Sequence, residues 1–144
     1  MSSISGKLPI WFWVIASIAL LWNALGVMAF VMQVSMSPEA LAALPEAERA
    51  LYETFPVWAL MAFAAAVFGG TIGSLFLLLR KALAYPVFII SLVGIIIQMI
   101  YNFFIAETMD VYGPGSIYMP IMVLVIGAFL VWFSKSSKQK GWIH

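Results

Sequence analysis

The chain has 144 residues, of which 65% are hydrophobic and only 9% carry a charged side chain. Charged residues make up about a quarter of an ordinary soluble domain, so this chain lacks the polar surface that would cover a water-facing globule. The net charge of +1 and the absence of a basic patch give no reason to expect a nucleic-acid partner. The chain has no cysteine, and His144 is its only histidine. Thiolate metal sites, thiol nucleophiles and bis-imidazole haem ligation within one chain are therefore excluded, and no cofactor or metal is expected.

Charged side chains are confined to short clusters that separate four charge-free runs. These runs are Leu8–Pro38, Thr54–Leu79, Ala82–Ala106 and Val111–Ser134. Each is longer than the ~20 residues that a helix needs to cross the hydrocarbon core of a bilayer. Continuous apolar runs favour helices, because a transmembrane strand alternates apolar and polar residues. We therefore predict an all-α protein, a four-helix transmembrane bundle in a single membrane domain, with spans near residues 9–33, 57–79, 82–106 and 117–134.

The sign of the charge alternates between the two sides of these spans. The carboxylates lie in two connections: Glu39, Glu46, Glu48 and Glu53 in the first, Glu107 and Asp110 in the last. The basic residues other than Arg49 lie at the opposite ends of the spans: Lys7, Arg80, Lys81, Lys135, Lys138 and Lys140. Because Lys and Arg flank spans on the cytoplasmic side, we expect the N-terminus and the C-terminus inside and both acidic connections outside.

The first acidic connection, residues 34–55, predicts a short amphipathic helical segment on the outer membrane surface. Ser37-Pro38-Glu39 combines an N-cap, a proline in the first turn and an acid near the helix start. Pro45-Glu46 repeats the pattern, so we expect two short helices with a break between them. Arg49 is placed to pair with Glu53 four residues later. Two roles stay open for this segment, a structural lid over the bundle and a gate for a substrate.

The second span carries a stripe of small residues: Gly69, Gly70, Gly73 and Ser74. Small residues four positions apart allow two helix backbones to approach closely in a membrane. The stripe is expected to be a helix-packing interface, either within the chain or between copies in a homo-oligomer.

Three uncharged amides are the main polar side chains inside the spans. Asn23 lies in the first span, and Gln98 and Asn102 lie in the third. At ~1.5 Å per residue all three reach a similar depth in the outer half of the bilayer. Gln98 and Asn102 are four residues apart and therefore share a helix face. Trp22 and Tyr101 adjoin these amides in sequence and are placed to flank the same cavity.

Two interpretations of the amides stay open. They could be interhelical contacts, since lipid offers amides no other partner, or they could line a ligand site for a neutral polyhydroxyl molecule. The spans contain no ionisable side chain that could relay protons, which argues against proton-coupled export. No nucleophile–base pair, phosphate-binding loop or metal constellation is present either, so we do not expect an enzyme.

Several segments together resemble one family. They are Leu21-Trp22-Asn23-Ala24-Leu25-Gly26-Val27-Met28, Met36-Ser37-Pro38-Glu39, Arg80-Lys81, Gln98-Met99-Ile100-Tyr101-Asn102-Phe103-Phe104 and the tail Lys140-Gly141-Trp142-Ile143. The chain resembles small, uncharacterised four-span proteins of the bacterial inner membrane, many of them labelled "sugar transporter". The resemblance extends over nearly the whole chain and implies solute transport in that membrane.

The sequence therefore predicts a multi-pass inner-membrane protein that transports or binds a small neutral polar solute. The alternative is a non-transporting accessory or assembly subunit of a membrane complex. The expected partners are the lipid bilayer and either further copies of the chain or a larger membrane complex.

Overall fold

The computed structural model describes residues 8–144, which form helices and connecting turns without any strand. The long helices are α2 (Ile10–Val34), α5 (Val57–Leu78), α6 (Ala84–Ile100) and α8 (Tyr118–Gln139). The short ones are α3 (Pro38–Ala42), α4 (Glu46–Glu53), the π-helix η1 (Tyr101–Ile105), α7 (Thr108–Tyr112) and the 3₁₀ helix η2 (Pro114–Ile117). Four helical segments are long and apolar enough to cross a membrane: α2, α5, α6 continued by η1, and η2 continued by α8. The predicted all-α four-helix bundle is confirmed, and the protein is a small multi-pass membrane protein.

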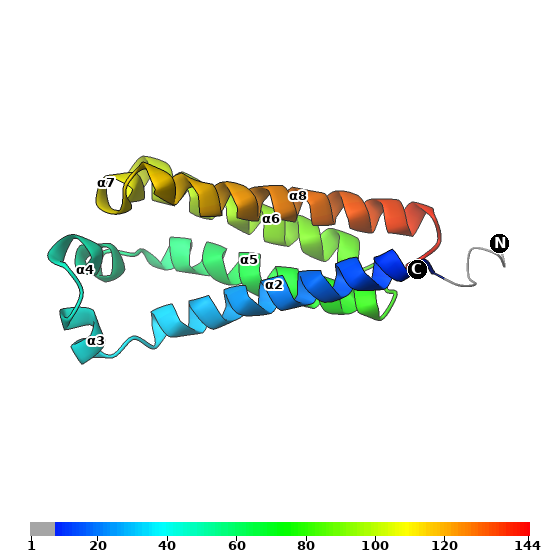
Figure 1. Ribbon diagram of the computed structural model, residues 1–144, viewed down its shortest axis with the longest axis horizontal. Helices are drawn as coiled ribbons and strands as arrows, with labels where there is room; N and C mark the ends of the chain where they lie inside the picture. The colour runs from blue at the N-terminus through cyan, green and yellow to red at the C-terminus, as the bar shows by residue number, and fades with distance from the viewer. Residues whose placement is uncertain (1–7) are drawn as a thin grey trace.

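The four long helices pack in chain order, not around a closed ring (Figure 1). Helix α5 packs against α2 on one side and against α6 on the other, and α8 packs against α6. Helices α2 and α8 lie at the two ends of this series. They approach each other at one end of the bundle and diverge toward the other (Figure 1).

Small residues on α5 and α6 allow these helices to approach closely. A Cβ on Gly69 would lie 3.1 Å from the Cβ of Ser91 on α6, and one on Gly73 would lie 2.8 Å from the ring of Phe88. Gly70 faces α2, where it contacts the side-chain amide of Asn23. With Ser74, these glycines are buried. The stripe is therefore filled by α2 and α6 of the same chain. This packing favours the alternative of a contact within the chain.

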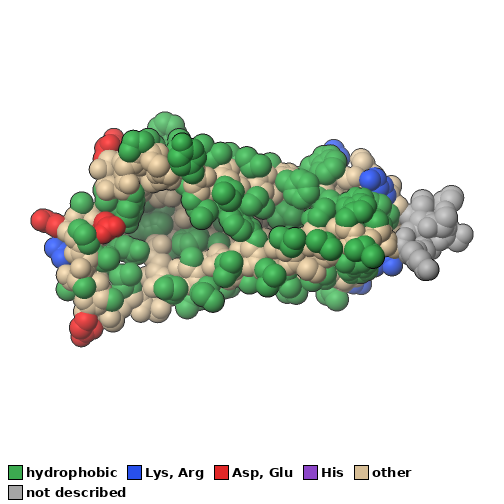
Figure 2. Space-filling model, in the orientation of Figure 1, with side chains coloured by type: hydrophobic (Ala, Val, Ile, Leu, Met, Phe, Trp, Pro, Cys, Tyr) green, Lys and Arg blue, Asp and Glu red, His purple; other side chains and the backbone are tan. Residues whose placement is uncertain are grey.

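The charged residues gather at opposite ends of the bundle (Figure 2). We call the end that carries α3, α4 and α7 the acidic end, and the end that carries the α5–α6 turn and the end of α8 the basic end. Lys7, one of the basic residues used to predict orientation, lies outside the described residues.

An aromatic cluster joins α2 to α8 at the basic end. The rings of Phe12 and Phe133 have centroids 5.7 Å apart, and Trp11 contacts Trp142 at 5.2 Å. We call these four residues the aromatic seal. Phe12 is completely buried, and Ile143 is 1% exposed. The tail after α8 thus folds back against the bundle and closes its basic end.

The tail is held by the turn between α5 and α6. Arg80 adopts a left-handed conformation with φ of 58°, which costs a non-glycine residue about 1–2 kcal/mol. In this conformation its Nε donates to the Trp142 carbonyl at 2.9 Å, and its own carbonyl accepts from the His144 N–H at 3.1 Å. Ala82 N–H donates in turn to the His144 carbonyl at 3.2 Å. The tight turn expected at Arg80-Lys81 is therefore also the docking site of the tail.

The first connection forms two short helices with a break, as predicted. The Ser37 hydroxyl caps α3 by accepting from the Ala40 N–H at 3.1 Å. The expected ion pair between Arg49 and Glu53 does not form among the described residues. Arg49 instead donates to the Ala42 carbonyl at 3.4 Å. A carbonyl at the end of α3 lacks a helical partner, whereas an exposed ion pair contributes only tenths of a kcal/mol.

Gly94→Ala tests the close contact between α5 and α6. A Cβ at this position would lie 2.7 Å from the Ala62 carbonyl oxygen and 2.9 Å from the Ala66 nitrogen. Because these are backbone atoms that cannot rotate away, we expect a loss of about 1–3 kcal/mol in unfolding free energy, seen as a lower thermal midpoint in detergent. Gly115→Ala is the matched control, since a Cβ there meets nothing within 4 Å. Equal midpoints for the two variants would contradict the packing described.

Candidate functional site

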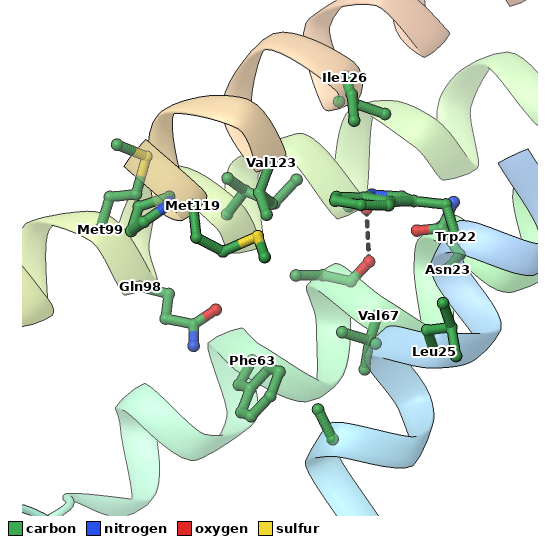
Figure 3. Close-up of a pocket in the computed structure, with 18 of the residues that line it drawn as sticks. Trp22, Asn23, Leu25, Phe63, Val67, Gln98, Met99, Met119, Val123 and Ile126 are labelled. Carbon is green, nitrogen blue, oxygen red and sulfur yellow. Dashed lines mark hydrogen bonds between the residues drawn. The ribbon is translucent and has the colours of Figure 1, made fainter. Parts of the chain in front are cut away.

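A cavity of about 420 Å³ lies between the diverging parts of α2 and α8, with α5 and α6 behind it. We call it the inner chamber. Figure 3 shows Phe63 and Val67 of α5 on one side of it, and Met119 and Val123 of α8 on another. Most of its lining is apolar, and Asn23, Ser91, Gln98 and Asn102 supply its polar side chains.

A second cavity, of about 290 Å³, lies toward the acidic end, among α4, the start of α5, η1 and α7. We call it the outer chamber. Phe63, Gln98 and Asn102 line both chambers, so the two are adjoining parts of one site. Polar and aromatic side chains dominate the outer chamber: Gln33, Tyr52, Phe55, Tyr101, Thr108, Tyr112 and Ser116.

The π-helix η1 shapes the boundary between the two chambers. Its wider turn is closed by a hydrogen bond from the Ala106 N–H to the Tyr101 carbonyl at 2.8 Å. The Thr108 hydroxyl donates to the Asn102 carbonyl at 3.3 Å, which satisfies one of the backbone groups at the end of the helix. Single π-turns inside helices are rare and occur frequently at functional sites. The sequence predicted one regular span here and gave no signal for this turn.

Asn23 behaves as an interhelical contact. Its Nδ2 donates to the Ala19 carbonyl at 2.8 Å and reaches the Ser74 hydroxyl on α5 at 3.5 Å. Gly70 provides the space that this amide occupies. The amide is thus held in place by α5, although one side of it lines the inner chamber.

Gln98 and Asn102 are in a different situation. No hydrogen bond joins either side-chain amide to another residue of the part that the structure describes, and both side chains are half-buried. Figure 3 shows the Gln98 amide directed into the cavity, on the opposite side from Asn23. The two amides are therefore free to bond to water or to a ligand in the cavity. The three amides line one cavity, as their similar positions along the spans led us to expect. Asn23 does not form a hydrogen bond with the other two.

Trp22 and Tyr101 flank different chambers. Trp22 lines the inner chamber, while Tyr101 lines only the outer one. Tyr101 is 95% buried and packs its ring against Phe55 and Trp58, with centroids 5.2 and 5.4 Å away. Trp22 and Tyr101 therefore flank different parts of one site, since Gln98 and Asn102 line both chambers.

The sequence did not single out Gln33, Tyr52 and Tyr112, which line the outer chamber. Aromatic residues near span ends are typical of membrane interfaces, and this hid the tyrosines among the other interfacial rings. Partial burial raises the pKa of Tyr112 above its ordinary value, with smaller contributions from Tyr52 and Glu48. The phenol therefore stays protonated at neutral pH and can donate a hydrogen bond.

The lining of both chambers includes no Asp, Glu, Lys, Arg or His. No group of His, Cys, Asp or Glu in residues 8–144 is placed to hold a metal ion. The site can therefore offer amide and hydroxyl hydrogen bonds, aromatic faces and apolar contact, which are means of binding a ligand.

Comparison of the chain with protein-family models, curated proteins and solved structures finds no match. The function is therefore argued from the geometry of the two chambers.

Replacing each amide with leucine separates the two interpretations of the amides. Asn23→Leu removes a bond to Ser74, and we expect it to lower the unfolding free energy by about 0.6–2 kcal/mol, the range for polar contacts between membrane helices. Gln98→Leu removes no hydrogen bond within the protein, so its cost should stay within about 0.5 kcal/mol. Thermal unfolding in one detergent measures both. A Gln98→Leu loss as large as that of Asn23→Leu would mean that Gln98 is also a packing contact.

Proposed function

We propose that this protein is a transporter or binding protein for a small neutral polar solute of sugar type, which it takes up from the outer side of a bacterial inner membrane. The N-terminus and the C-terminus lie in the cytoplasm, since the basic end of the bundle faces the cytoplasm under the positive-inside rule. The acidic end, and with it the outer chamber, then faces outward.

The observation that supports this most directly is the pair of unpaired amides at the junction of the chambers. A carboxamide offers both donors and an acceptor, which is the combination that hydroxyl groups need. Tyr52, Tyr101 and Tyr112 add aromatic faces and hydroxyls around them. Binding sites of this kind combine a few convergent polar groups with apolar and aromatic walls, in volumes of about 300–1,000 Å³.

The ligand is neutral, because nothing in the lining would compensate a charge. A charged group placed there would lose its hydration without gaining an ion-pair partner, a cost that buried sites avoid. Movement of the ligand to the cytoplasm would require separation of Phe12 from Phe133, since the aromatic seal closes the basic end.

The alternative is a non-transporting accessory or assembly subunit. The large apolar surface of α2 and α8 favours this alternative. In the most apolar part of each of these two spans, only 11% of the residues are buried. Such surface can face lipid or a helix of another chain. Either function is compatible with a homo-oligomer.

A thermal-shift screen with neutral sugars, polyols and glycosides tests the proposal. A ligand that binds only the folded state raises the thermal midpoint, and at about one hundred times Kd it adds about 2.7 kcal/mol of stability. We expect at least one such compound to stabilise the wild-type protein. The double variant Gln98→Leu/Asn102→Leu should fold normally and lose the response.

Two further results decide this test. The response should be unchanged between about pH 5.5 and about pH 8.5, because no side chain in the lining has an ordinary pKa in that range. The pKa of Tyr112 is already above that range, and partial burial raises it further. Failure of every compound to stabilise the wild-type protein would favour the accessory subunit.

Single cysteines test the orientation, and the chain has no native cysteine to interfere. Ala43, between α3 and α4, and Gln139, at the end of α8, are both exposed. In intact cells we expect Ala43→Cys to react with a membrane-impermeant maleimide and Gln139→Cys to react only after the membrane is opened. The reverse pattern would turn the outer chamber toward the cytoplasm.

A further inference from the structure

The two chambers differ in chemistry, and the difference identifies the kind of ligand. We propose that the site holds a neutral amphiphile from the outer leaflet, with a hydroxyl-rich headgroup in the outer chamber and a hydrocarbon chain in the inner chamber. The proposal rests on the function proposed above and assigns its substrate class: a glycoside or similar molecule that carries an alkyl chain, not a free sugar.

The inner chamber is unsuited to a sugar but suited to a hydrocarbon chain. Its polar side chains are the amides and Ser91, whose hydroxyl already donates to the Ala66 carbonyl. The rest of its walls are formed by apolar side chains such as Val67, Val123 and Ile126. A hydroxyl group placed among them would be desolvated without a partner, at a cost that a methylene group does not incur. A free sugar would satisfy its hydroxyls near the amides and in the outer chamber, and would leave the apolar part of the larger chamber unused.

The depth of the inner chamber matches one leaflet. Its lining on α8 extends from Met119 to Leu130, which is roughly 16 Å at ~1.5 Å per residue. Half of a ~30 Å hydrocarbon core is about the same. A chain that reaches the bottom of the chamber would therefore extend as far as its neighbours in the outer leaflet, with its headgroup at the level of η1 and α7.

The inner chamber opens sideways, toward the region that lipid occupies. Helices α2 and α8 do not pack against each other along their outer halves, and Figure 2 shows the hollow between them on the long side of the molecule. The rim is apolar and exposed: Leu25 of α2 is 61% accessible and Met119 of α8 is 58% accessible. An alkyl chain can enter through such a rim without leaving hydrocarbon, whereas a polar solute cannot.

The outer chamber selects the headgroup. Its amides, phenols and hydroxyls form hydrogen bonds with hydroxyl groups, and no charged side chain lines it. A phosphate would lose its hydration there without a cationic partner. Its five aromatic rings could also contact a quaternary ammonium group, so a cationic headgroup belongs among the probes.

Three probes with one chain and different headgroups test the proposal: dodecyl glucoside, dodecyl phosphate and dodecyltrimethylammonium. Free glucose is the fourth probe. The full chain is placed in phosphatidylcholine nanodiscs, each probe is added at trace levels, and bound molecules are counted by native mass spectrometry. We expect dodecyl glucoside to bind at least about tenfold more tightly than each of the other three, a difference of one decade in Kd.

Two variants locate the chain. Val123→Trp places a large side chain in the inner chamber and should abolish binding of dodecyl glucoside. Val125→Trp is the matched control, because Val125 lies on the same helix, is 60% exposed and does not line either chamber. It should bind as the wild type does. Equal thermal midpoints for the two variants ensure that a loss of binding is not a loss of folding.

Each other outcome overturns the proposal in a distinguishable way. Free glucose that binds as tightly as dodecyl glucoside, and equally to Val123→Trp, would refute the amphiphile and leave the proposed solute binding intact. Tighter binding of dodecyl phosphate or dodecyltrimethylammonium would refute the neutral headgroup. No specific binding of any probe would refute both proposals. A wild-type dimer that Val123→Trp converts to a monomer would identify a second copy as the occupant of the inner chamber.

Discussion

The close approach of α5 to both of its neighbours determines the shape of this protein. In lipid there is no hydrophobic force between helices, so contact depends on how closely their surfaces fit. Gly69 and Gly73 bring α6 close on one side, and Gly70 brings α2 close on the other. Helices α2 and α8 have no equivalent pair of small faces, and they are joined at the basic end, where the aromatic seal lies. The cavity is the space that remains where this seal ends.

Polar groups within the spans follow the same division. Where α5 packs closely against its neighbours, the serine hydroxyls have partners: Ser91 donates to the Ala66 carbonyl at 2.6 Å, and Ser74 donates to the Gly70 carbonyl at 2.7 Å. Where α2 and α8 diverge, Gln98 and Asn102 have none among the described residues. An unpaired amide is costly in hydrocarbon. The cost is avoided only if these amides contact water or a polar ligand, which the open part of the bundle can admit.

The bundle could be predicted because membrane helices depend on composition over some twenty residues, which a single sequence displays directly. Ser37 and the prolines likewise identified the short helices, since caps act within one turn.

Other features depend on contacts between distant segments. The glycine stripe was visible in the sequence, but the helices that pack against it were not. The sequence pattern of a contact within the chain is the same as that of a contact between two copies. Nothing in the apolar run around Tyr101 indicated a π-turn, and the sequence did not show that Tyr101 and Trp22 line different chambers. The amides were found because polar residues are rare in a span, whereas Tyr52 and Tyr112 were hidden among ordinary interfacial aromatics.

The two ends of the bundle also differ in how well their polar atoms are satisfied. Within the described part of the chain, the two buried side-chain atoms without a hydrogen-bond partner are Arg80 Nη2 and Ser137 Oγ, and both lie at the basic end. Arg80 is in addition held in a left-handed conformation by its bonds to the tail. The tilted and edge-to-face ring contacts of the aromatic seal favour the closed arrangement, while a strained arginine with an unpaired donor opposes it. The closed basic end is therefore a balance between these effects, and separating the tail from the α5–α6 turn would cost less than the burial of Phe12 and Ile143 alone suggests.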